Sequence, residues 1–161
     1  MKAWLVRIIA LVVFGVSFAL PAVRLSGGGP DASPIPGWTC AVFASILGPK
    51  SLVQSIGQGV RTEDVLIVVS GLVNYLFLAI VVLSFWRRLV RTRLVTGALM
   101  LACFVATWVY FATSHTAPLV GHYLWFGGAM LILVPDLAYF FSRREAGAAV
   151  QESAGRGPAG R

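Results

Sequence analysis

Residues 64–86 read DVLIVVSGLVNYLFLAIVVLSFW, and no charged side chain interrupts the run after Asp64. An α-helix needs about 20 mostly apolar residues to cross a hydrocarbon core roughly 30 Å thick, and this run has that length. Two arginines, Arg87 and Arg88, follow directly and end the apolar run. We therefore predict a membrane-spanning helix at 64–86.

Three further runs have the same character and lie at 3–23, 94–113 and 122–142. The 161-residue chain is 58% hydrophobic and 12% charged, whereas a soluble domain is about 45–50% apolar and about 25% charged. The sequence therefore predicts an all-α fold, an integral membrane bundle of four transmembrane helices within residues 1–144. The tail at 145–161 is rich in small residues and glycine, and we predict that it is disordered in the cytoplasm.

Lys and Arg residues are distributed unevenly around the predicted spans. If the N-terminus is cytoplasmic, ten of the 13 lie at inner ends, and only Arg24, Lys50 and Arg61 lie outside. Cytoplasmic loops carry such an excess, so we predict an inner (cytoplasmic) membrane protein with both termini inside. The net charge of +7 then reflects topology and attraction to anionic lipid headgroups. The sequence lacks a basic face interleaved with aromatic side chains, so we predict no nucleic-acid partner.

The first run has a second interpretation, a cleaved signal peptide, because Lys2 is basic and the segment Leu20-Pro21-Ala22 is similar to a cleavage region. Its apolar core is longer than the roughly 7–15 residues of such peptides. Arg7 also interrupts the core. These features favour a span that is retained, and either interpretation leaves the C-terminus inside.

The outer loop at 24–63 begins with a Gly- and Pro-rich turn and continues with an apolar stripe at helical spacing. A weaker stripe follows a break at Gly48 and Pro49. Both pieces are too short to span a membrane, so we predict a short amphipathic helical cap at the outer interface. The alternatives are an irregular loop packed on the helix ends and a substrate lid. The first stripe consists of Trp38, Val42, Phe43 and Ile46.

Two charged residues, Arg7 and Asp136, fall inside the predicted spans, where a charge costs about 2.5–3.5 kcal/mol by insertion scales. Asp136 precedes Arg143 by seven residues, which places it roughly 10 Å below the inner interface, and Arg7 lies at a comparable depth. We predict an ion pair between Arg7 and Asp136 that joins the first and fourth helices. In one alternative, Arg7 reaches the inner headgroups while Asp136 meets water or Arg143. In another, Asp136 belongs to a proton or ion relay.

Small and amide side chains within the spans predict contacts between helices. Asn74 lies in the middle of the second span, and we expect it to hydrogen-bond to a neighbouring helix, with a ligand contact as the alternative. Small residues let helices approach closely, either inside the bundle or against another membrane subunit. These residues are Ala98, Ala102 and Ala106, which recur every fourth position, and the neighbours Gly127 and Gly128.

Cysteine and histidine residues predict no reactive site. Cys40 lies in the outer loop and Cys103 lies about 15 Å from either end of its span, so a disulfide cannot join them. His115 and His122 together with Cys40 offer zinc ligands, but their spacing fits no known pattern, and we interpret the histidines as interface residues beside an aromatic belt. The sequence also lacks hydrolase, metalloprotease and nucleotide-binding motifs, so we predict no cofactor, no metal and no enzyme.

Four short segments carry a further signal. They are Leu20-Pro21-Ala22, Gly37-Trp38, Asn74-Tyr75-Leu76-Phe77 and Gly121-His122-Tyr123-Leu124-Trp125. Together they resemble a pattern shared by small four-helix inner-membrane proteins of bacteria, a family whose function is uncharacterised. The resemblance extends from Leu20 to Trp125. It implies the four-helix topology and supplies no activity.

The small-residue stripes and the lack of a reactive cluster predict a non-enzymatic accessory or scaffold subunit. Its partners would be the lipid bilayer and another membrane protein or a second copy of the chain. The alternative is a small transporter, channel or lipid-handling protein that uses the polar residues Arg7, Asn74 and Asp136 inside the membrane.

Overall fold

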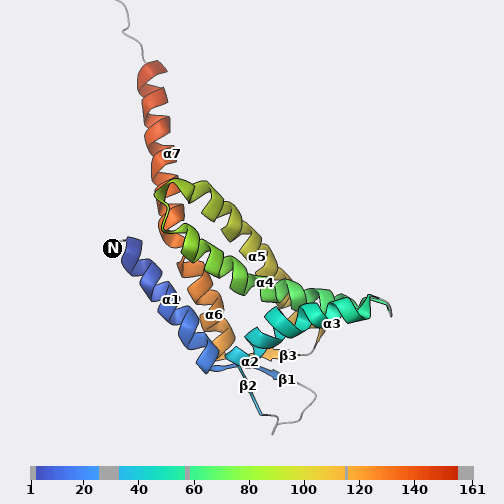
Figure 1. Cartoon of the computed structure of the whole chain (residues 1–161). Helices are drawn as coiled ribbons and strands as arrows, with labels where there is room; N and C mark the ends of the chain where they lie inside the picture. The colour runs from blue at the N-terminus through green and yellow to red at the C-terminus, as the bar shows by residue number, and fades with distance from the viewer. Residues whose placement is uncertain (1–2, 26–32, 57–58, 115, 156–161) are drawn as a thin grey trace, which may run out of the picture.

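The computed structural model describes residues 3–25, 33–56, 59–114 and 116–155. The predicted turn at 26–32, Lys2, His115 and the tail residues 156–161 lie outside these ranges. The described chain is mostly helical (Figure 1). Its elements in order are α1 (Ala3–Ala19), β1 (Pro21–Leu25), β2 (Ile35–Pro36), α2 (Gly37–Val42), the π-helix η2 (Phe43–Leu47), α3 (Gly48–Ser55), α4 (Thr62–Leu83), the 3-10 helix η3 (Arg87–Leu89), α5 (Val90–Thr113), β3 (Thr116–Pro118), α6 (Val120–Leu131) and α7 (Val134–Gly155).

In the described residues, three helical segments are long and apolar enough to cross a membrane. They are α4, α5 and Val120–Glu145, the last formed by α6 and the first half of α7. The first predicted span, 3–23, is shorter than expected, because α1 has 17 residues and extends only about 25 Å.

The all-α prediction is corrected at one end of the bundle, where three short strands form a sheet in the order β2-β1-β3. β1 is antiparallel to both neighbours, with Val23 opposite Ile35 of β2 and Pro118 of β3. Proline explains the change from helix to strand. Pro21 has no N–H and disfavours helical backbone at Leu20, so α1 ends early and the chain continues extended.

The helices form two antiparallel pairs, α1 with α6 and α4 with α5. Figure 1 shows the pairs together where α1 begins and α4 passes into α5, and diverging toward the sheet. We call the first the basic end, because Arg7, the α4–α5 connection and the arginines that follow it lie there. We call the other the sheet end.

Aromatic side chains join the two pairs in the middle of the bundle. Phe14 of α1 stacks on Phe77 of α4 with ring centroids 3.7 Å apart. Phe104 of α5 meets Trp125 of α6 edge-on at 4.8 Å. Aromatic pairs contribute about 0.5–1.5 kcal/mol beyond their buried area, so these contacts fix how one pair sits on the other. The apolar core around them includes Ala10, Val73, Ile80, Met100, Cys103, Ala129, Ile132 and Leu133.

The second half of the outer loop is helical rather than irregular, because α2, η2 and α3 follow one another from Gly37 to Ser55. The predicted stripe is exposed, with Trp38 59% and Ile46 62% accessible. The opposite side of the run lies against α4, where a Cβ atom at Gly71 would overlap the carbonyl of Ala44. This run is therefore amphipathic, with one side on the bundle and an apolar stripe facing outward.

Pro135 divides the predicted fourth span into two helices. The proline ring would clash with the carbonyl of Leu131 in a continuous helix, and proline has no backbone N–H to donate. As a result, α6 ends at Leu131 and α7 begins at Val134. The predicted disorder from residue 145 also differs from the structure, in which α7 continues to Gly155. Ala, Glu and Gln are strong helix formers, and here they extend a helix that has already nucleated.

Large apolar side chains point outward on every long helix. Val12 of α1, Leu78 of α4, Val95 of α5 and Phe141 of α7 are each more than half exposed. Soluble proteins rarely expose contiguous apolar patches larger than a few hundred Å². Together with the three long apolar segments, this surface indicates a membrane-embedded protein.

We expect Gly128→Ala to destabilise the bundle, because a Cβ atom there would lie 2.8 Å from the backbone nitrogen of Phe14. Overpacking of this kind costs about 1–3 kcal/mol. Gly127→Ala is the matched control on the same helix, since nothing lies within 4 Å of its added Cβ atom. The thermal unfolding midpoint in detergent should fall for Gly128→Ala and stay equal or rise for Gly127→Ala. Equal midpoints would refute the close approach of α1 and α6.

Candidate functional site

At the basic end, the structure brings together the two charged residues that the sequence placed inside spans. Nη2 of Arg7 donates to Oδ1 of Asp136 at 3.0 Å, joining α1 to the start of α7. The Asp136 side chain is 3% exposed and that of Arg7 is 22% exposed. Arg7 therefore pairs with a buried carboxylate, as the ion-pair prediction requires.

A third residue, Arg93 of α5, belongs to the same cluster. Its Nε donates to Oδ2 of Asp136 at 2.8 Å and its Nη2 donates to Oδ1 at 2.7 Å, which is a bidentate pair. Its Nη1 donates to the carbonyls of Leu83 and Trp86 at the end of α4, at 3.0 and 2.8 Å. We call Arg7, Arg93 and Asp136 the ion cluster, and it connects all four long helical segments.

Local structure explains how the ion cluster holds its charges. Asp136 lies in the first turn of α7, because Pro135 restarts the helix there, and a helix N-terminus favours a carboxylate. Arg93 donates to the carbonyl of Leu83, the last residue of α4, where the helix dipole favours a cation. Both oxygens of the carboxylate accept guanidinium bonds, which is the arrangement that makes a buried charge tolerable.

Arg93 was predicted only as part of the basic flank of a span, although the chain contains a signal for its burial. The buried face of α5 includes Gly97, Met100, Phe104 and Thr107, at alternating spacings of three and four. Arg93 precedes Gly97 by four residues and so continues that face. Extending the apolar periodicity backwards through the charged segment would have identified Arg93 as a buried cation.

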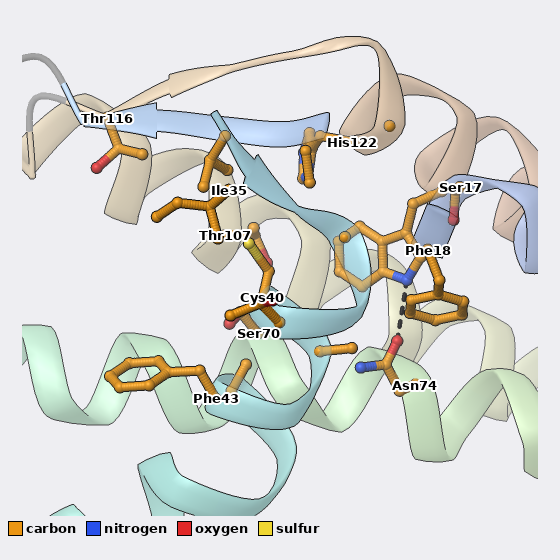
Figure 2. A pocket seen from close by; sticks show the side chains of 18 of the residues that line it. Ser17, Phe18, Ile35, Cys40, Phe43, Ser70, Asn74, Thr107, Thr116 and His122 are labelled. Carbon is orange, nitrogen blue, oxygen red and sulfur yellow. Dashed lines mark hydrogen bonds between the residues drawn. The ribbon is translucent and has the colours of Figure 1, made fainter. Parts of the chain in front are cut away.

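At the sheet end, a cavity of about 410 Å³ lies between the two helix pairs (Figure 2). Its wall includes the end of α1, the α2–η2 run, α4, α5 and α6, and β1 and β3 contribute Val23 and Thr116. Most of the lining is apolar, as Phe18 and Phe43 illustrate. The side chains that offer hydrogen-bonding groups include Ser70, Asn74, Thr107, Tyr110 and His122.

Asn74 bridges three elements beside this cavity. Its Nδ2 donates to Oγ of Ser45 in η2 at 3.0 Å, and its Oδ1 accepts from Nε1 of Trp125 in α6 at 2.9 Å (Figure 2). Tyr75 donates from its hydroxyl to the carbonyl of Ser45 at 3.0 Å. Asn74 thus makes the interhelical hydrogen bonds that its position predicted, and it also lines the cavity. Sequence reasoning missed Ser45, which lies in a loop segment without a polar pattern.

His122 is buried, and its side chain packs among aromatic rings. It is 4% exposed, and its ring centroid lies 4.7 Å from that of Phe111 and 5.3 Å from that of Trp125. Among the described residues its Nε2 has no hydrogen-bond partner. His122 lines the cavity as a residue, while its Nε2 atom is itself buried.

The two cysteines are free thiols, as the sequence analysis expected. Burial raises the pKa of the Cys40 thiol to about 11, so this cavity-lining side chain stays protonated at neutral pH and is a poor nucleophile. Within the residues described, no three His, Cys, Asp or Glu side chains are grouped to hold a metal ion. His115, which the sequence also offered as a zinc ligand, lies outside the described ranges.

The predicted small-residue surfaces differ in their exposure. Gly128 is buried against α1, whereas Gly127 faces open space. Ala98 and Ala102 are exposed and Ala106 is partly exposed, so this stripe is not the contact between α5 and α4. The alanine stripe therefore remains on the outer surface of the bundle.

The four segments that carry the resemblance converge on the cavity. The backbone N–H of Gly37 donates to the carbonyl of Leu20 at 2.9 Å, and Trp125 donates to Asn74. Each of the four segments also supplies at least one residue of the cavity wall. No protein-family model, no curated protein and no solved structure matches the chain. The resemblance to a bacterial family therefore stays a prediction from these segments.

We expect Arg93→Gln to destabilise the protein more than Arg7→Gln does. It removes the bidentate bond and leaves the Asp136 charge buried, which costs about 3–5 kcal/mol. Arg7→Gln should cost less, because the Arg7 side chain is partly exposed and makes one bond. The free energy of unfolding in mixed detergent micelles measures both effects.

Arg91→Gln is the matched control for Arg93→Gln, because Arg91 is exposed on the same helix turn. In the double variant Arg93→Gln/Asp136→Asn, the loss should be smaller than the sum of the two single losses. Additive losses, or an Arg91→Gln loss equal to that of Arg93→Gln, would contradict the cluster.

Proposed function

We propose that this protein is a non-enzymatic integral membrane protein that binds a lipophilic small molecule in the cavity at the sheet end. Its α1, α4, α5 and α6–α7 segments form four spans of a bacterial inner membrane, and both termini lie on the cytoplasmic side. The observation that carries the proposal is the apolar cavity of about 410 Å³, with a few polar groups in its wall.

The distribution of charge in the fold supports this orientation. Arg88, Arg91, Arg143 and Arg144 lie with the ion cluster at the basic end, whereas Arg24 lies in β1 at the sheet end. An excess of Lys and Arg marks the cytoplasmic side of a membrane protein. In this orientation the cavity lies in the outer half of the bundle, and the sheet lies at the outer interface.

The size and lining of the cavity favour a small lipophilic ligand. Ligand cavities commonly have about 300–1,000 Å³ and a mostly apolar wall with a few placed polar groups. Here Phe18, Phe43 and Trp125 supply apolar surface, while Thr107 and His122 supply hydrogen-bonding groups. A ligand with one carbonyl or hydroxyl group would match the few hydrogen-bonding groups of this wall better than a pure hydrocarbon.

A transporter or channel with one polar path through Arg7, Asn74 and Asp136 receives less support. Asn74 lines the cavity at the sheet end, whereas Arg7 and Asp136 belong to the ion cluster and are not among the lining residues. Both oxygens of Asp136 are already occupied by guanidinium bonds. The cluster acts as a structural connection in this proposal.

A second candidate function is that of an accessory or scaffold subunit. Its support is the alanine stripe on α5, which faces outward and serves no contact inside the helix pair. Small residues permit close approach of another transmembrane helix, from a partner protein or a second copy. This function is compatible with ligand binding, because the stripe and the cavity occupy different surfaces of α5.

Thr107→Phe should reduce ligand binding by filling the cavity. Thr107 is 4% exposed and lines the cavity, so a larger side chain there must occupy its volume. Protein purified from native membranes in mild detergent is extracted with organic solvent, and the extract is analysed by mass spectrometry. We expect a lipophilic compound near one molecule per chain in the natural protein and a loss of about tenfold in the variant.

The control is Val82→Phe, which adds a similar volume at an exposed position on α4. It should leave the extracted compound unchanged, and circular dichroism should show that both variants are folded. Equal amounts of compound in all three proteins, or no compound in any of them, would refute binding in the cavity.

Ala102→Phe tests the accessory function separately. Ala102 is exposed in the middle of the alanine stripe, so the larger side chain should leave folding intact and obstruct a neighbouring helix. We expect a co-purifying membrane protein, or a dimer, in the natural protein and its loss in the variant. Leu78→Phe, exposed on α4, should retain the partner. A natural protein that is monomeric and alone in mild detergent would count against this function.

A further inference from the structure

An open groove with a strongly positive lining lies at the basic end, opposite the cavity. Its volume is about 730 Å³, and its two sides come from the η3–α5 junction and from α7. We call it the arginine groove. It is lined by Arg88, Val90, Arg91, Tyr139, Phe140, Arg143 and Arg144.

The four arginines of the groove form two pairs, Arg88 with Arg91 on one side and Arg143 with Arg144 on the other. All four are exposed, and none of them is in a salt bridge with a carboxylate of the described residues. Glu145 follows Arg144 in sequence but is not among the lining residues. The groove therefore concentrates four cations without an acidic side chain in its lining.

The apolar part of the groove lies where a lipid chain would pass. Tyr139 and Phe140 are 47% and 44% exposed, and both fall within the helical segment Val120–Glu145 that is long enough to span a membrane. Cζ of Arg143 lies 5.5 Å from the centroid of the Tyr139 ring, so the aromatic ring and the cation form one surface. Charged groups lie at the end of this segment, and apolar groups lie toward the bilayer.

We propose that the arginine groove binds an anionic phospholipid that carries two phosphate groups. Guanidinium groups bind phosphate bidentately, and one pair of arginines faces each phosphate. Basic pockets between transmembrane helices on the cytoplasmic side bind such headgroups. The acyl chains then follow Phe140 and Tyr139 into the bilayer.

The apolar wall distinguishes a lipid from a soluble anion. A free phosphate or diphosphate would use the four guanidinium groups but leave the exposed rings of Tyr139 and Phe140 uncovered. A phospholipid covers both surfaces at once, and its local concentration in the membrane is high. This inference rests on the membrane placement proposed above and is independent of the ligand in the cavity.

The test uses the full chain in nanodiscs of phosphatidylcholine, with or without cardiolipin as the probe. Cardiolipin should raise the thermal unfolding midpoint, and native mass spectrometry should show cardiolipin retained on the natural protein. Arg91→Gln/Arg143→Gln removes one cation from each side of the groove. Because each basic residue contributes on the order of 1 kcal/mol near a membrane surface, its apparent affinity should fall about tenfold or more.

Arg24→Gln/Arg61→Gln is the matched control, because it removes the same charge at exposed positions outside the groove. Its affinity for cardiolipin should change less than about twofold. If the first double variant fails to fold, Arg88→Gln/Arg144→Gln makes the same test with the other two arginines.

Two results would overturn the proposal. The first is an equal loss of cardiolipin in the groove and control variants, which would show attraction by net charge alone. The second is an equal rise of the unfolding midpoint with inorganic diphosphate, which would identify a site for a soluble anion. Thr107→Phe, the cavity variant, should bind cardiolipin as the natural protein does, so the two proposed sites can fail separately.

Discussion

At the basic end, the Asp136 carboxylate accepts hydrogen bonds from Arg93 and Arg7, and the Arg93 guanidinium also donates to the carbonyl of Leu83 at the end of α4 and to that of Trp86 beyond it. Each of these groups is polar, and a bilayer offers no water to replace a lost partner. The bonds therefore specify depth and rotation for four helical segments at one level. Aliphatic packing alone tolerates small shifts of a helix along its axis, whereas a bidentate ion pair does not. The alignment of the helix pairs follows from this cluster.

From that fixed end, the two helix pairs diverge until the α2–η2 run and the sheet fill the space between them. The stacked rings of Phe14 and Phe77 mark the middle of the bundle, and beyond them the separation leaves room for the cavity. Asn74 and Trp125 join the pairs across this wider part through one hydrogen bond. The ligand site proposed here is thus a consequence of helix geometry as much as of the side chains that line it.

Much of this arrangement could be predicted from the sequence. Length and hydropathy were sufficient to predict the three long apolar segments. The isolated charges of Arg7 and Asp136 at matching depth were sufficient to predict their contact. The amphipathic stripe beginning at Trp38 could also be predicted, because the spacing of apolar residues shows which face of a helix is apolar. The outward direction of the alanine stripe could not be predicted, since small residues occur both at contacts inside a bundle and at contacts with another protein.

The missed features have physical reasons. Arg93 lies in a charged segment, where membrane topology is a sufficient reason for an arginine, so the periodicity that continues the buried face of α5 through it was passed over. The sheet depends on pairing between segments that are far apart in sequence, and local propensity contains no signal for such pairing. The cavity arises from the divergence of the helix pairs, a property that no single segment carries.

The small sheet also affects the order in which the fold forms during biosynthesis. β1 emerges from the ribosome early, but its partner β3 follows about 90 residues later, after α4 and α5 have been made. Until then, one edge of β1 lacks its hydrogen-bonding partner, and the chamber lacks the wall that α6 provides. A nascent chain halted before Val120 would therefore contain α1, α4 and α5 but lack the part of the cavity wall that α6 provides. The complete cavity forms only after α6 has been added.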